Sequence, residues 1–489
     1  MRCRWTFALL TLFVLSAGPG RAFAQVMPTA GSPTQGKWTT KFAWPHVAIH
    51  LIVLPNGKVI SWAREDSNAP PGQGIAPATL WNPATKTFTD VTYTAADLFC
   101  TGHSLLPDGR LFVAGGHIQD NIGIPNSTIF DPATNGWTAG PLMNAGRWYP
   151  TNTTLPNGDV LVVSGSNANG RNQLPQVYQI ASGTWRSLTA ALLNQPLYPR
   201  MLLAPDGRVF DAGPSQTTRL LNTSGTGGWT TVGNSLWGFR DYGTAVMYDV
   251  GKVLIAGGGD PPTKTAEVID LTAPTPTWRF TNSMQFVRRH LNSTLLPNGK
   301  VLVTGGTSSP GFNDVTGAIL AAEIWDPVTE VWTTVASMKV PRIYHGTAVL
   351  LPDATVLSTG SGKPAGSGGD TDHLNAEIFL PPYLFKPDGK RAGQPKIFSA
   401  PTSVSYGQTF AIDTSTPAKI RKVSWIRLSS STHAFNMEQR ISFLTFTKKT
   451  GGLNVTAPSN PNLVPPGYYM LFILNESGVP SVAKIIRIG

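Results

Sequence analysis

One short pattern returns along almost the whole chain and limits the folds open to it. A turn such as Leu-Pro-Asn-Gly or Leu-Pro-Asp-Gly precedes a short apolar run that ends near glycine. Seven copies follow one another, roughly 50 residues apart: LPNGKVISWA, LPDGRLFVAGG, LPNGDVLVVSG, APDGRVFDAG, YDVGKVLIAGGG, LPNGKVLVTGG and LPDATVLSTGSG. Most copies are followed by a second strand-and-turn signal that ends in tryptophan, such as FDPATNGW or WDPVTEVW. The chain is therefore expected to repeat one supersecondary unit.

Each unit is expected to form four antiparallel strands. Asn-Gly and Asp-Gly pairs join the first two strands as a hairpin, and the tryptophan segment supplies the other two. Four strands at this period indicate an all-β fold, a seven-bladed kelch-type β-propeller. Residues 36–42 carry the tryptophan-strand pattern ahead of the first copy, and the last copy lacks it. We therefore expect 36–42 to complete the last blade and close the ring.

The two ends of the chain differ from the repeat. A basic start, an apolar run and an Ala-Phe-Ala site indicate a secretory signal over 1–24, with a retained signal anchor as the alternative. The propeller is assigned to 25–390. Residues 391–489 alternate with β period and are assigned to a C-terminal immunoglobulin-like β-sandwich. We expect a secreted protein that is extracellular or periplasmic after cleavage near Ala24. No stable membrane insertion is expected.

Charge and cysteine content narrow the possible partners. The formal net charge of +11 suits contact with anionic glycans or cell surfaces. Lysine and arginine are scattered without an aromatic-basic motif, so no nucleic-acid partner is expected. Signal removal takes Cys3 and leaves Cys100, which then has no internal disulfide partner. Cys100 is either a buried inert thiol or a chemically active one.

One position of the repeat carries the residues with redox and metal-binding chemistry. It lies seven residues before the turn proline, or before Asp249 in the fifth copy, where each first strand begins. From the second copy to the seventh, this slot holds Cys100, Tyr149, Tyr198, Tyr242, His290 and His345, whereas Ala48 fills it in the first copy. These side chains are expected to meet at one mouth of the central channel. Phenols and imidazoles suit Cu(II); zinc is the alternative, but it gives a thiol beside a phenol no role.

Five segments in this chain resemble, in order, the copper radical oxidases, the family of galactose oxidase and glyoxal oxidase. They are Asp97–Cys100, Arg147–Tyr149, Arg342–His345, Thr432–Arg440 and Pro466–Phe472. The resemblance runs from near residue 36 to the C-terminus and includes the last domain, which belongs to the early-set type in this family. It implies a copper-dependent oxidase that uses O2 and releases hydrogen peroxide.

The resemblance also implies roles for individual residues. Tyr149 would be an equatorial copper ligand, joined to Cys100 by a self-processed thioether that holds a radical. Tyr344 would be the axial phenol and the base. His345 and His433 would be the imidazole ligands of the one copper ion, with the C-terminal domain carrying His433 up the channel. Catalysis is thereby assigned to Tyr149, Cys100 and Tyr344.

Two departures from galactose oxidase affect the substrate and the cover of the site. Asn167 stands where galactose oxidase has an indole over the thioether, and Trp237 is the expected substitute. Trp148 is expected to point to the opposite face of its strand. The galactose-binding arginine is replaced by Thr307 and Ser308. Together with the sequence Arg-Trp-Tyr, these departures resemble the glyoxal oxidase branch. That resemblance implies small aldehydes, as their hydrates, or primary alcohols as substrates.

The remaining ring residues and histidines have less defined roles. Tyr198, Tyr242 and His290 either line the substrate mouth or are ordinary polar groups of the channel. His103 is expected to be structural, and four histidines are expected on the surface or in loops: His46, His50, His117 and His373. A monomer with a possible peroxide-using partner enzyme is expected. The alternative function is a non-catalytic kelch propeller that binds a glycan or a protein, which gives no reason to place Cys100 next to Tyr149.

Overall fold

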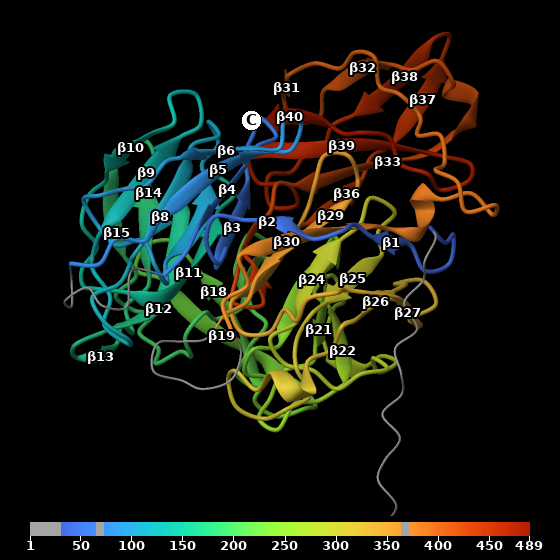
Figure 1. The fold of residues 1–489 in the computed structure, drawn as a ribbon. Helices are drawn as coiled ribbons and strands as arrows, with labels where there is room; N and C mark the ends of the chain where they lie inside the picture. The colour runs from blue at the N-terminus through green and yellow to red at the C-terminus, as the bar shows by residue number, and fades with distance from the viewer. Residues whose placement is uncertain (1–30, 65–72, 363–370) are drawn as a thin grey trace, which may run out of the picture.

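The computed structural model describes residues 31–64, 73–362 and 371–489, so the proposed signal at 1–24 lies outside the described part. In these ranges the secondary structure consists of strands and three short 3-10 helices: η1 (Val315–Gly317), η2 (Pro382–Leu384) and η3 (Pro417–Lys419). The predicted all-β class is confirmed. Figure 1 shows sheets arranged around a common axis and, above them, a smaller C-terminal body.

Sheets that contain a copy of the repeat are called blades here and numbered in chain order. Blade 1 contains β3 (His50–Val53), β4 (Val59–Trp62), β5 (Ala78–Asn82) and β6 (Thr87–Asp90). Blade 2 contains β7 (Gly102–Leu105), β8 (Leu111–Ala114), β9 (Ser127–Asp131) and β10 (Gly136–Ala139). Blade 3 contains β11 (Trp148–Thr154), β12 (Val160–Asn167), β14 (Gln176–Gln179) and β15 (Thr184–Ser187), with β13 (Gly170–Arg171) on β12. Blade 4 contains β16 (Met201–Leu203), β17 (Val209–Asp211), β18 (Thr217–Asn222) and β19 (Gly228–Asn234).

The later copies form sheets of the same order. Blade 5 contains β20 (Thr244–Asp249), β21 (Lys252–Ala256), β22 (Ala266–Asp270) and β23 (Arg279–Phe280). Blade 6 contains β24 (Asn292–Leu295), β25 (Val301–Thr304), β26 (Ala321–Trp325) and β27 (Trp332–Ser337). Blade 7 contains β28 (Gly346–Leu350), β29 (Val356–Gly360), β30 (Asn375–Leu380) and β1 (Lys37–Trp38), with β2 (Phe42–Ala43) also on β30.

The N-terminal strand closes the ring as expected for residues 36–42. Strand β1 pairs with β30, with Lys37 opposite Leu380 and Trp38 opposite Phe379. The indole of Trp38 donates to the carbonyl of Ala336 at 2.7 Å. The last blade therefore takes its outer strand from the start of the chain, so that β30 is paired on both sides.

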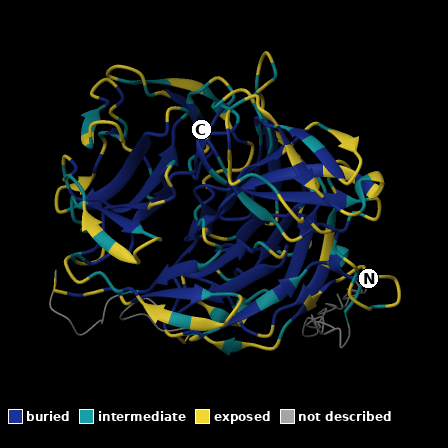
Figure 2. Cartoon of the chain, turned by 90° about the horizontal axis from the view of Figure 1, so that it is seen from above, coloured by how far each residue is buried: buried dark blue, intermediate teal, exposed yellow. Residues whose placement is uncertain are grey.

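The inner strands of the blades form the core of the propeller. Strands β3, β7, β11 and β24 are buried along their whole length, whereas the outer strands β6 and β10 are mostly exposed. Figure 2 shows buried residues in the interior and exposed residues toward the rim. Side chains at the inner strand ends therefore lie in a water-poor channel.

The C-terminal domain is a β-sandwich with its own core. One sheet has the order β31 (Ser403–Val404), β40 (Lys484–Ile488), β39 (Gly467–Asn475), β33 (Ile420–Arg427) and β36 (Ile441–Phe443). The other has the order β32 (Thr409–Asp413), β38 (Gly452–Thr456) and β37 (Phe446–Lys449). The faces that meet are apolar and include Ile412, Trp425 and Leu453.

A hairpin leaves this sandwich and enters the propeller. It consists of β34 (Ser430–Thr432) and β35 (Phe435–Asn436), and β34 pairs with β3 of blade 1, with His50 opposite Thr432. The hairpin thus extends the sheet of blade 1, and the two domains share one continuous sheet there. His433 is the residue at the tip of this hairpin, directly after β34.

The segment that follows the hairpin joins several blades. The side-chain amide of Gln439 donates to Ser293 O at 2.8 Å in blade 6, and Arg440 donates to Leu203 O at 2.9 Å in blade 4. Glu438 accepts a hydrogen bond of 2.9 Å from Thr154 in blade 3. Residues 438–440 therefore fasten the C-terminal domain to the inner strands.

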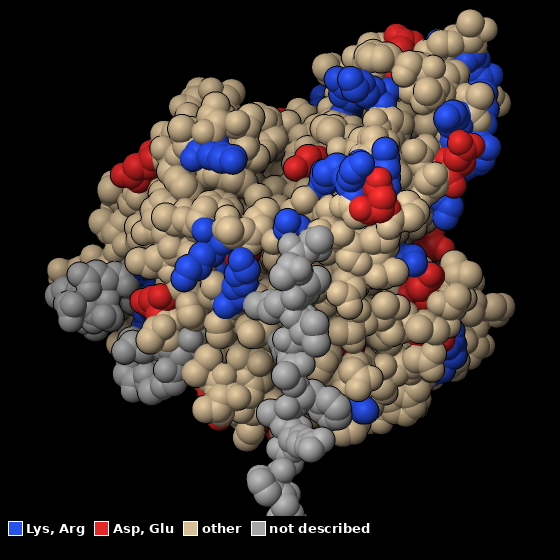
Figure 3. Space-filling view, turned by 45° about the vertical axis from the view of Figure 1, so that its right-hand side comes forward, with Lys and Arg blue, Asp and Glu red and all other residues tan. Residues whose placement is uncertain are grey.

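Figure 3 shows how charged side chains are distributed on one face of the protein. There, Lys and Arg side chains lie in separate groups, interrupted by uncharged surface and by acidic residues. Among the described residues, no helix is long and apolar enough to cross a membrane.

Candidate metal centre

The slot identified in the repeat has one unusual backbone conformation in six blades. Its residues have positive φ angles: Cys100 62°, Tyr149 65°, Tyr198 45°, Tyr242 50°, His290 60° and His345 65°. Residues other than glycine rarely adopt this left-handed conformation, and where it recurs it often marks a functional site. Each of these residues lies at the entrance of its strand, where the left-handed conformation changes the direction of its side chain.

Backbone hydrogen bonds join neighbouring slots across the blades. Tyr149 N donates to Cys100 O, Tyr198 N to Tyr149 O, and His290 N to Tyr242 O, each at 2.9 Å. The slots are therefore in contact in space, although about 50 residues separate them in the chain.

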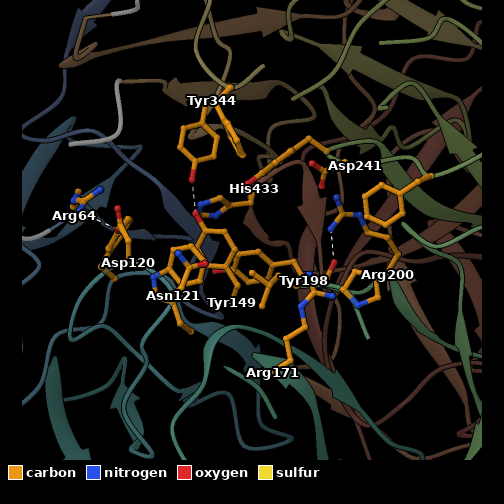
Figure 4. Close-up of a pocket in the computed structure, with 17 residues that line it drawn as sticks. Arg64, Asp120, Asn121, Tyr149, Arg171, Tyr198, Arg200, Asp241, Tyr344 and His433 are labelled. Carbon is orange, nitrogen blue, oxygen red and sulfur yellow. Dashed lines mark hydrogen bonds and ion pairs between the residues drawn. The ribbon is translucent and has the colours of Figure 1, made fainter. Parts of the chain in front are cut away.

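Four buried side chains meet at this end of the channel. The phenol oxygens of Tyr149 and Tyr344 lie 2.5 Å apart. The ring of His433 lies 4.4 Å from that of Tyr149 and 4.9 Å from that of His345, measured between centroids. Figure 4 shows Tyr344 and Tyr149 facing one another beside His433. The structure thus brings together the four residues expected to bind metal.

The imidazoles of this cluster present nitrogen atoms suited to a metal. Nε2 of His345 and Nε2 of His433 are buried and have no hydrogen-bond partner among the described residues. Nδ1 of His433 is engaged with the hydroxyl of Thr432 at 2.6 Å, which leaves Nε2 available to a metal ion. Burial lowers the pKa of both rings well below the usual value, so both are neutral and keep a lone pair.

The phenols depend on a cation to ionise. Burial raises the pKa of Tyr149, and the nearby Cys100 and Tyr344 raise it further. Burial and Cys100 also raise the pKa of Tyr344. A bound cation reverses this by stabilising a phenolate. Two imidazole nitrogens and two phenol oxygens match the preference of Cu(II) for nitrogen and oxygen ligands, so the residues fit copper.

Trp148, not Trp237, covers Tyr149, and the expectation for Trp148 is wrong. Its ring stacks on Tyr149 with centroids 3.6 Å apart and planes 6° from parallel. The left-handed φ of Tyr149 breaks the alternation of faces on which the expectation depended. Trp237 is 38% exposed and does not line the cavity at the centre. Asn167 does not line it either, and it donates to Gly146 O at 3.3 Å.

A cavity of about 360 Å³ leads to the cluster. Tyr149, Tyr344 and His433 line it, together with Tyr198 and Tyr242. His290 lies behind this wall, with its ring 4.4 Å from Tyr242 and 5.4 Å from Tyr344. Two half-exposed aromatic residues stand at the outer part: Phe239 and Phe312.

Three histidines expected on the surface or in loops are buried. His46, His50 and His117 have exposed fractions of 6%, 0% and 4%. The Trp148 indole donates to Nδ1 of His117 at 3.1 Å, which fixes the stacked ring. Sequence reasoning missed them because their side-chain partners lie on other strands: Ser61, His103 and Trp148.

Two family models named after copper-dependent oxidases of one group match this chain. The family model of the glyoxal oxidase N-terminus matches residues 45–215 and 259–383. The model of the galactose oxidase-like early set domain matches residues 394–488.

Individual relatives are similar over most of this chain. A galactose oxidase of Gibberella zeae is 34% identical, over 94% of this chain and 72% of its own. An aldehyde oxidase of Vitis pseudoreticulata is 28% identical, over 80% of this chain and 82% of its own. A solved structure of a fungal alcohol oxidase in complex with copper has a TM-score of 0.85 and 29% identity, over 93% of this chain and 99% of that one.

Proposed function

Because the chain belongs to the copper radical oxidase family of galactose oxidase and glyoxal oxidase, and is an oxidase with a copper cofactor, we propose that it oxidises small aldehydes, as their hydrates, or primary alcohols. O2 is the proposed acceptor and hydrogen peroxide the product. The buried cluster of Tyr149, Tyr344, His345 and His433, with its unpartnered imidazole nitrogens, carries this proposal. A non-catalytic binding propeller gives no reason for such a cluster.

Tyr149, Tyr344, His345 and His433 are the proposed copper ligands. When bound, the copper supplies one of the two oxidising equivalents needed and mediates electron transfer to O2. The second equivalent is proposed to be held by Tyr149, joined through a thioether to Cys100. Trp148 stacks on that ring and covers one of its faces.

Two residues of the chain are proposed to act directly on the substrate. The phenol oxygen of Tyr344 takes the proton of the substrate hydroxyl. The oxygen of Tyr149 takes a hydrogen atom from the carbon that carries this hydroxyl. For an aldehyde hydrate the balance is RCH(OH)2 + O2 → RCOOH + H2O2. For a primary alcohol it is RCH2OH + O2 → RCHO + H2O2. Two electrons and two protons leave the substrate in either case.

The setting of this activity is also proposed. We assign 25–390 to the propeller and 391–489 to the domain that supplies His433, after export and removal of 1–24. A secreted monomer that delivers peroxide to a partner enzyme fits an oxidase of this kind.

Intact mass tests the proposed cofactor. Copper and air should convert the Cys100 S–H and a Tyr149 ring C–H into one C–S bond, with O2 reduced to H2O2. The protein should therefore weigh two hydrogens less than the copper-free form, and Cys100→Ser should keep its full mass. Copper-treated wild-type protein in which Cys100 can still be alkylated after denaturation contradicts the proposal.

A peroxide-coupled assay tests the substrate class. Glyoxal and methylglyoxal should exceed galactose in kcat/KM by at least about tenfold, because a missing polar contact to a sugar costs at least that much discrimination. Thr307 is the reason within the chain: it is buried and its hydroxyl is engaged with Asp314 O at 2.9 Å, so it offers no side chain equivalent to a sugar-binding arginine. Glycerol and benzyl alcohol are measured in the same assay. The expectation is contradicted if galactose gives the highest kcat/KM.

A further inference from the structure

The slot-to-slot hydrogen bonds that join blades 2, 3 and 4 do not continue back to blade 1. The slot residue of blade 1, Ala48, is not left-handed, and its carbonyl accepts from the hydroxyl of Thr347 at 2.8 Å. The backbone N–H of Cys100 donates instead to Nε2 of His50, at 3.1 Å. A side chain two residues beyond the slot thus takes the place of the carbonyl that serves Tyr149 and Tyr198 in the next blades.

This contact fixes the protonation of a chain of side chains. Nε2 of His50 accepts from Cys100, so in the neutral ring Nδ1 carries the proton. Nδ1 of His50 lies 3.0 Å from Nε2 of His103, which therefore accepts. Nδ1 of His103 then donates to the hydroxyl of Ser430, at 2.5 Å. Ser430 donates back to His103 O at 3.0 Å, and the chain ends there.

The chain of hydrogen bonds is enclosed by other residues. His50, His103 and Ser430 have exposed fractions of 0%. The indole of Trp62 stacks on His50 with centroids 4.8 Å apart and planes 12° from parallel, and it donates to Leu98 O at 2.7 Å. Burial lowers the pKa of His103 to about 3, so the ring is neutral. Because the chain has no exit to solvent in the described residues, it serves position, not proton transport.

Its members come from three parts of the protein. His50 lies on β3 of blade 1 and His103 on β7 of blade 2, while Ser430 lies on β34 of the C-terminal hairpin. Thr432, opposite His50 on β34, precedes His433 and bonds to its ring. The chain thus connects the backbone of Cys100 with the strand that carries His433.

We propose that His50 and His103 are positioning residues that hold Cys100 in its left-handed conformation for thioether formation. This inference rests on the proposed thioether function of the same site. The two imidazoles do not line the substrate cavity, and neither is a proposed ligand; the ring of His50 lies 6.0 Å from that of His433, measured between centroids. Their effect should therefore appear in cofactor assembly, while copper uptake stays intact.

Three variants test the role of His50. His50→Phe keeps a flat ring beside Trp62 but removes both nitrogens, whereas His50→Gln keeps an oxygen that accepts from Cys100. His46→Phe is the matched control: His46 is another buried histidine of the same blade region, bonded to Ser61 at 3.0 Å. The measurement is the rate at which copper-loaded protein in air loses two hydrogens, followed by intact mass, with bound copper quantified beside it.

The expected order identifies a positioning effect. His50→Phe should cross-link at least about tenfold more slowly than wild type with the same copper content, since one buried hydrogen bond is worth about that factor. His50→Gln should recover most of the rate, and His46→Phe should match wild type. Wild-type speed in His50→Phe overturns the inference, as does a Gln variant as slow as the Phe variant. If wild type itself never loses two hydrogens, the proposed function fails instead.

A second measurement needs no variant and no copper. ¹⁵N-histidine NMR of the copper-free protein should show His50 and His103 as neutral rings protonated at Nδ1. A His50 ring protonated at Nε2 cannot accept from Cys100 and overturns the inference. This result is independent of whether His50→Phe folds.

Discussion

Replacing Tyr149 by phenylalanine should lower kcat for every accepted substrate by at least about a thousandfold, or roughly 4 kcal/mol of activation free energy. The change removes one atom, the phenol oxygen that lies 2.5 Å from the oxygen of Tyr344. In the proposed mechanism, that oxygen binds copper, holds the radical and receives the hydrogen atom. The ring itself can remain stacked under Trp148. Peroxide release at saturating substrate and O2 measures the loss.

Tyr198→Phe is the matched control for this prediction. Tyr198 occupies the next slot, has the same backbone conformation, and stacks on Tyr149 with centroids 4.4 Å apart. Its hydroxyl donates to Thr101 O at 2.9 Å, so its removal should cost stability of about 1–3 kcal/mol. Its kcat should stay within about tenfold of wild type, since no proposed chemical step uses this oxygen. Equal losses of kcat in two folded variants would contradict the role given to Tyr149.

The repeat made the slot predictable because its distance from a turn is fixed. Asn-Gly and Asp-Gly turns define the hairpin register, and counting back from them finds the same strand entrance in each copy. Cys100, Tyr149 and His345 follow from this count, and the structure gives all six occupied slots one backbone conformation. The count did not reveal that conformation, because nothing in the local sequence requires a positive φ at tyrosine or histidine.

That hidden conformation explains the errors around the site. The expected direction of Trp148 assumed alternating faces, and a single left-handed residue at Tyr149 cancels that rule. The buried position of His50 was missed for another reason: its partner His103 lies 53 residues away, and Ser430, the end of their chain, lies 327 residues from His103. Contacts of this kind follow from the docking of the C-terminal hairpin, which a local pattern does not contain.

The motif Thr432–Arg440 was read for His433 alone, yet its last residues determine how the domains dock. Glu438 and Arg427 form an ion pair whose side chains are 1% and 2% exposed. Arg427 also donates to Tyr469 at 3.2 Å and to Thr154 at 3.2 Å. Burial alone would lower the pKa of Arg427, but Glu438 and Tyr469 raise it above its usual value. The guanidinium of Arg427 is therefore charged in the folded protein.

Glu438→Gln should destabilise the protein by about 3–5 kcal/mol, because it leaves the guanidinium of Arg427 buried without its counter-charge. It also weakens the contact between Glu438 and Thr154 on β11, the strand that carries Tyr149. Denaturant unfolding followed by fluorescence and circular dichroism measures the loss. Asp108→Asn is the matched control, because Asp108 pairs with Arg110 at 2.7 Å where both side chains are nearly half exposed. An exposed pair of this kind contributes about 0–1 kcal/mol.

Glu438→Gln also tests whether the docking of the C-terminal domain helps the site to retain copper. Glu438 touches none of the proposed ligands, but it follows His433 by five residues and fastens the hairpin segment to blade 3. If docking holds His433 in place, Glu438→Gln should lose copper to a chelator faster than wild type at a temperature where both remain folded, and Asp108→Asn should not. Equal copper release in the three proteins would mean that the pairing of β34 with β3 alone seats His433. Faster release in Glu438→Gln would assign the buried ion pair a part in metal retention.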